Sequence, residues 1–185
     1  MAGISRRIFI AAALAPVALA ACSNGIGSQG AAEVDARATA ALDYLYRTYP
    51  DTQGLAQRAS GILVMPLMTK VGLGFGGSYG RGVLRVGGTT VDYYSATSAS
   101  AGIQIGAQQY SHVLFFMTPD ALADFRASPG WVAGAGVDYA IAGEGETLLA
   151  DTTTSMSRVI AVIFGQSGLR VGATVEGTKY TRIIP

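Results

Sequence analysis

The chain has 185 residues and nearly balanced charge, with 13 basic and 12 acidic side chains. Electrostatic binding of nucleic acid needs a basic surface, so this balance excludes it and we expect no nucleic-acid partner. The single cysteine excludes a disulfide within the chain. The 14% of charged residues and the 25 glycines favour a turn-rich β domain over a helical bundle.

Residues 1–21 have the layout of a secretory signal peptide. The pair Arg6-Arg7 precedes an apolar run up to Ala21, and this run is shorter than the roughly 20 residues of a membrane-spanning helix. It ends in Leu-Ala-Ala-Cys22, which resembles a bacterial lipobox, where the leader is cut off just before a cysteine that becomes acylated. We therefore predict lipid attachment at Cys22.

The leader also bears on export and destination. Arg6-Arg7 within SRRIFI resembles a twin-arginine signal, but paired arginines also occur in ordinary secretory signals, so both routes stay open. Ser23 follows the cysteine in place of an aspartate, which by resemblance to lipoprotein sorting signals directs the protein to the outer membrane. We expect a bacterial cell-envelope protein, anchored through Cys22 in the outer membrane and facing the periplasm.

Residues 22–30 are small and polar after the cysteine and predict a flexible tether, followed by a single domain at residues 31–185. Apolar residues at helical spacing predict an amphipathic helix over 31–49, which Pro50 ends. Asp51 is a candidate cap for a second helix through Ala59. Membrane-surface helices carry mostly Lys and Arg on their polar face. The first helix mixes charges, so we expect it to dock on the domain's own sheet.

From Gly61 onward the pattern becomes β. We expect strands at 61–66, 71–86, 89–97, 102–118 and 131–141, with a Gly87-Gly88 hairpin turn and a short helix at 119–128. A loop at 142–146 and a strand and turn at 147–154 should follow. Two or three strands are expected within 158–184, with a hairpin near 165–168. The predicted fold is mainly β with helices (α+β): a compact, strongly curled, antiparallel, barrel-like sheet with the N-terminal helix packed on it.

The stretch VGLGFGGSYGRG (71–82) has only Gly or Ser at even positions and carries Phe75 and Tyr79 at odd ones. Since strand residues alternate between faces, one face of this segment is bare. Glycine in a strand costs roughly 0.5–1 kcal/mol relative to alanine, so we expect a compensating close contact with the barrel interior or the N-terminal helix. A nucleotide-binding turn is rejected, because strand rather than helix follows the glycines.

Several blocks resemble the SYLF domain in its bacterial lipoprotein form, and they occur in the family's order: GGSYGRGVL (76–84), YYSATSASAGIQIGAQQYSHVLFFMT (93–118), FRASPGW (125–131), DTTT (151–154) and VEGTKYTRI (175–183). The resemblance runs from about residue 35 to 184. It implies a compact, mostly β, barrel-like domain with packed helices, and lipid binding. In eukaryotic relatives it implies phosphoinositide and actin binding. Here Arg37, Arg47 and Arg58 are interspersed with acidic residues, so we transfer the fold and lipid binding only.

The residues offer little for catalysis. His112 is the only histidine, and its neighbour Ser111 must face the other way in a strand, so the two do not form a nucleophile–base pair. A Ser-His-Asp set assembled from distant residues stays open. Glu144, Glu146 and Asp151 miss the spacing of an EF-hand. We expect a structural histidine, no metal, no cofactor and no enzymatic activity.

The resulting hypothesis is a non-catalytic, membrane-anchored lipoprotein whose domain binds phospholipid or a fatty acyl chain. Tyrosine suits such a contact because it has an apolar body and a polar tip. The candidate lipid-binding residues are Leu42, Leu45, Tyr46, Phe75 and Tyr79. Two alternatives remain open: a structural or interaction module for another envelope protein, and a hydrolase acting on lipid or cell wall.

Overall fold

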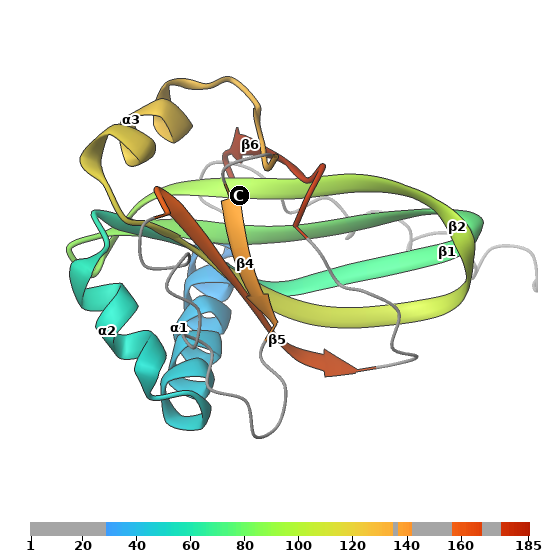
Figure 1. Ribbon diagram of the computed structural model, residues 1–185, viewed down its shortest axis with the longest axis horizontal. Helices are drawn as coiled ribbons and strands as arrows, with labels where there is room; N and C mark the ends of the chain where they lie inside the picture. Colours follow the sequence, from blue (N-terminus) through green and yellow to red (C-terminus); the bar gives the residue numbers. More distant parts are fainter. Residues whose placement is uncertain (1–28, 135–136, 142–156, 168–174) are drawn as a thin grey trace, which may run out of the picture.

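The computed structural model describes residues 29–134, 137–141, 157–167 and 175–185. Three helices cover a six-stranded sheet (Figure 1): α1 (Gly30–Thr48), α2 (Asp51–Arg58) and α3 (Pro119–Ala127). The strands are β1 (Gly61–Val86), β2 (Thr89–Phe116), β3 (Trp131–Val132), β4 (Val137–Ile141), β5 (Val159–Ser167) and β6 (Lys179–Ile183). The fold is therefore α+β, with a strongly curled, mainly antiparallel sheet and α1 packed on it, as the sequence predicts.

A single long hairpin, β1–β2, organises the sheet. Its register runs from Gly61 opposite Phe116 to Val86 opposite Thr89, where Gly87-Gly88 form the turn with positive φ. The first part of β2 also pairs with β6, and its last part pairs with β5. Midway along, β1 and β2 curve back together at the right-hand end of Figure 1, away from the helices. We call residues 71–79 of β1 and 97–107 of β2 the hairpin bend.

The curl brings the two halves of β1 against each other, and the glycines allow this contact. A Cβ added to Gly80 would lie 2.5 Å from the carbonyl oxygen of Leu67, and one added to Gly82 would collide with the carbonyl oxygen of Val64. Gly80, Gly82 and Ser78 are buried. At Gly80 and Gly82 the bare face therefore packs against backbone inside the barrel, as predicted, while α1 lies on the opposite face of the strand.

Two hydrophobic cores stabilise the fold. The inner core lies inside the curled sheet; its buried residues include Leu63, Met65, Met68, Leu84, Tyr94, Tyr110, Leu114, Phe116, Phe125, Ile163 and Tyr180. The outer core lies between the sheet and the first two helices; it includes Val34, Ala38, Leu42, Leu45, Leu55, Val64, Val83, Val113, Phe115, Ile160, Val162 and Phe164. Helix α1 thus covers the part of the outer sheet face that includes Val83.

A polar cluster fixes α1 to the end of the hairpin. The Asp35 carboxylate accepts hydrogen bonds from the hydroxyls of Thr90 and Tyr93, at 2.6 Å each, and pairs with Arg85 at 3.5 Å. Burial raises the pKa of Asp35, but these hydrogen bonds and the Arg85 charge outweigh it and leave the pKa below its ordinary value. The hydrogen bond to Asp35, aided by burial, raises the pKa of Tyr93 to about 12.

A second polar cluster joins α3 to the sheet. Asp92 of β2 lies 3.4 Å from Arg126 of α3 and 3.4 Å from Arg182 of β6. The Thr118 hydroxyl caps α3 by accepting from the Ala121 N–H, and Pro119 begins the helix. Phe125 is fully buried, so this short helix packs against the inner core.

Some element predictions were wrong. Pro66 does not end a strand, because a register irregularity between Met65 and Met68 absorbs it and β1 continues. Residues 98–101 do not interrupt β2. Asp51 makes no capping hydrogen bond. The predicted strand at 131–141 is two strands, of which β4 runs parallel to β5. The hairpin predicted near 165–168 does not begin at Gly165, because β5 continues to Ser167. The predicted signal peptide, the loop and strand at 142–154, and residues 168–174 lie outside the described residues.

Candidate functional site

His112 lies in the inner core, fully enclosed. One ring nitrogen, Nε2, shares a 2.8 Å hydrogen bond with the Tyr180 hydroxyl, and the Tyr110 ring stacks nearby with centroids 6.0 Å apart. The other nitrogen, Nδ1, is buried without a hydrogen-bond partner among the described residues. Burial lowers the pKa of His112 to about 3 and raises the pKa of Tyr180 well above its ordinary value, so both side chains are neutral at physiological pH.

The surroundings of His112 do not form a nucleophile–base pair in the described part of the chain. The Ser111 hydroxyl donates to the carbonyl oxygen of Pro66 at 2.7 Å, on the other face of the strand. The Ser78 and Ser98 hydroxyls share a 2.6 Å hydrogen bond inside the barrel. Among the described residues, His, Cys, Asp and Glu nowhere gather in threes as a metal site would require. These buried polar side chains therefore form hydrogen bonds within the fold.

The outer face of the hairpin bend carries exposed apolar side chains. Phe75 is 84% exposed, Val71 55% and Tyr79 54%, although residues this apolar are usually buried. All three occupy odd positions of β1, on the same face as Val83, and their partners on β2 are small: Val71 faces Ala107, Phe75 faces Ala101 and Tyr79 faces Thr97. We call Val71, Phe75 and Tyr79 the apolar strip. It continues the outer face beyond the part that α1 covers.

The five predicted lipid-contact residues do not gather in one place. Leu42 and Leu45 are buried in the outer core beneath α1, and Tyr46 is half-buried against the same core. Phe75 and Tyr79 lie on the apolar strip. The sequence reasoning omitted Val71, although its odd position in the glycine-rich segment places it on the same face. Cys22 lies outside the described residues.

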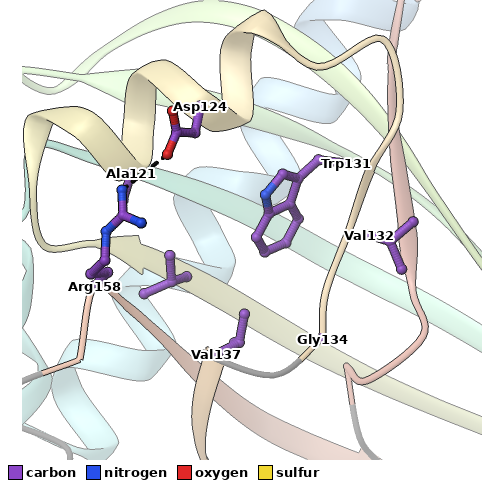
Figure 2. Close-up of a pocket in the computed structure, with 8 residues that line it drawn as sticks. Ala121, Asp124, Trp131, Val132, Gly134, Val137 and Arg158 are labelled. Atoms are coloured by element: carbon purple, nitrogen blue, oxygen red, sulfur yellow. Dashed lines mark hydrogen bonds and ion pairs between the residues drawn. The ribbon is translucent and has the colours of Figure 1, made fainter.

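The described residues also line one shallow pocket of about 250 Å³ beside α3 (Figure 2). The Trp131 indole forms one wall, with Val137 below it (Figure 2), and Val159 also lines the pocket. Asp124 and Arg158 form an ion pair of 2.9 Å at the rim. Both charged side chains are more than half exposed, so the pair contributes little binding energy of its own.

In the part of the chain that the structure describes, no helix combines the length and apolar character needed to cross a bilayer. Among the described side chains of β1, those of the apolar strip are the most exposed large apolar ones. The hairpin bend lies at the end of the molecule away from α1 and α2 (Figure 1).

Comparison with known proteins found a matching family. A family model described as Ysc84, Las17-binding protein actin regulator, matches residues 97–182. The match includes most of β2, the whole of α3, and all the strands from β3 to β5. No curated protein matches the chain. Residues 97–182 therefore belong to the SYLF (Ysc84) domain family.

Proposed function

We propose that this protein is a non-catalytic lipoprotein of the bacterial cell envelope whose SYLF domain binds lipid. Membership of the family suggests a lipid-binding or actin-regulator-like module. The apolar strip is the observation that favours lipid as the ligand, because its three large side chains are exposed to water in the free domain. Transferring them to an apolar environment is favourable by roughly 25 cal/mol per Å² of apolar surface.

The interior supports a non-catalytic role. His112 is sealed off from solvent and held neutral, and Ser111 points away from it. A hydrolase would need its base within hydrogen-bond reach of a nucleophile and of the substrate. The leader sequence supports anchoring: two acyl chains on Cys22 would retain the domain at the outer membrane, whereas one chain gives only about 10⁴ M⁻¹.

The test is binding of the chain from residue 22 onward, carrying Cys22→Ser, to vesicles made from bacterial lipid extract. We expect flotation with the vesicles, weakened about tenfold by Phe75→Ser, since burying a phenylalanine contributes at least about 1.5 kcal/mol. Val91→Ser is the matched control, because Val91 is 41% exposed on β2 close to the Gly87-Gly88 turn, at the opposite end of the hairpin from the strip. Absence of lipid in both flotation and native mass spectrometry would contradict the proposal and favour a protein partner in the envelope.

A further inference from the structure

The hairpin bend combines its apolar strip with an unusual distribution of charge. Between Asp51 and Asp92 the chain has no acidic residue, while Lys70 and Arg81 stand at the two ends of the apolar strip. On the opposite strand, residues 93–118 contain no Asp, Glu, Lys or Arg. Neither strand of the bend therefore contains an acidic residue, and Arg81, at an odd position of β1, shares the face of the apolar strip.

The shape of the bend indicates what kind of lipid contact it can make. The strip lies on the outer face of a strand, where the curled sheet turns back at the end of the molecule (Figure 1). Its exposed β2 neighbours, Ala99 and Ala107, are small, so Phe75 projects beyond them. A projecting side chain on a convex face can enter a bilayer interface, whereas a single extracted lipid requires a concave pocket that surrounds it.

From these observations we infer that the hairpin bend is the membrane-contacting surface of the domain, and that its partner is a bilayer surface rich in anionic phospholipid. The inference rests on the proposed function and specifies it. Phe75 enters the interface, Tyr79 lies at the boundary with its hydroxyl towards the headgroups, and Arg81 lies near the phosphates. Each basic residue near an anionic surface contributes about 1 kcal/mol, which corresponds to about fivefold in affinity.

This surface differs from the one that α1 offers. The apolar face of α1 is already buried in the outer core, with Leu42 and Leu45 covered, and Asp35 holds the helix to Arg85, Thr90 and Tyr93. Its use as a membrane helix would require opening that core. The bend needs no rearrangement, because its apolar side chains are exposed in the folded domain.

The experiment places one carboxylate in the bend. The chain from residue 22 onward with Cys22→Ser is titrated with phosphatidylcholine vesicles, with and without phosphatidylglycerol, and with short-chain phosphatidylglycerol kept monomeric. We expect tighter binding to the anionic vesicles than to the zwitterionic ones, and about fivefold weaker binding to the anionic vesicles for Ala99→Glu. Thr89→Glu, on an exposed residue at the far end of the same strand, is the control and should bind as the parent does.

A second readout locates the contact directly. A Phe75→Cys variant in the same background, labelled with an environment-sensitive fluorophore, should shift its emission to the blue on addition of anionic vesicles, whereas a label at Val91→Cys, near the Gly87-Gly88 turn, should not shift. If the parent and Ala99→Glu bind vesicles equally and the label at Phe75→Cys does not shift, the inference is overturned and the proposed function still stands. Stoichiometric binding of the monomeric lipid without vesicle binding would do the same. Failure to bind any of the three lipid forms would overturn both.

Discussion

His112 shows how one buried residue makes the stability of this protein depend on pH. Its pKa is lowered to about 3 by burial, from an ordinary value of 6.5. Below pH 6.5 the unfolded chain takes up a proton on this ring and the folded chain does not, so the free energy of unfolding falls as the pH falls towards 3. The stabilisation is fully present above pH 6.5 and is lost progressively below it.

We expect the free energy of unfolding to drop by about 2 kcal/mol between pH 7 and pH 5 from this residue alone. Urea titrations across this range would measure the drop. Because the chain has one histidine, His112→Asn should remove most of the slope in this window, above the range in which carboxylates titrate. Parallel pH profiles for the parent and the variant would show that His112 is not responsible.

Strand β1 is the element whose unusual composition the structure explains most directly. Its two halves touch where Gly82 meets the backbone of Val64 and Gly80 meets that of Leu67. A carbonyl oxygen cannot move aside as a flexible side chain can, so any side chain at Gly82 must push the two halves apart. The contact therefore depends on the absence of a Cβ atom.

Gly82→Ala should lower the free energy of unfolding by about 3 kcal/mol or more, the upper range for overpacking a core. Gly54→Ala in α2 is the matched control, since nothing lies within 4 Å of a Cβ added there. The control should be neutral or stabilise the protein by about 0.5–1 kcal/mol, because alanine favours helix. Thermal melts of both variants would measure this contrast, and a Gly82→Ala variant as stable as its control would refute the close contact.

The same strand shows how far the sequence alone could lead. Alternation of small and large residues predicted a strand with one bare face, and this was confirmed. Pro66 was interpreted as an end because proline removes a backbone donor, yet a local irregularity can accommodate it within a strand. For the site, the sequence placed Phe75 and Tyr79 on one face, but periodicity could not tell which apolar faces the fold would cover. From the sequence alone, Leu42 and Leu45 are as plausible for lipid contact as Phe75. The structure buries both leucines, because α1 packs on the sheet.

At the scale of the whole molecule, β2 joins two halves of one sheet. Its first part pairs with β6 and its last part with β5, while β1 pairs with it throughout. Neither half can lose β2 without exposing the inner core to water. This shared strand should make the domain unfold in one cooperative step.

A core substitution in one half tests this cooperativity. Val162 of β5 is fully buried in the outer core, and Val162→Ala should cost about 2 kcal/mol and lower the melting temperature by about 4–8 °C. Trp131, the only tryptophan, packs against the inner core beside β6, so its fluorescence reports on the other half. Circular dichroism and tryptophan fluorescence should show the same shift, and the exposed-site control Val132→Ala should shift neither. A fluorescence midpoint that stays in place while the dichroism midpoint falls would mean that the two halves unfold separately and that β2 does not couple them.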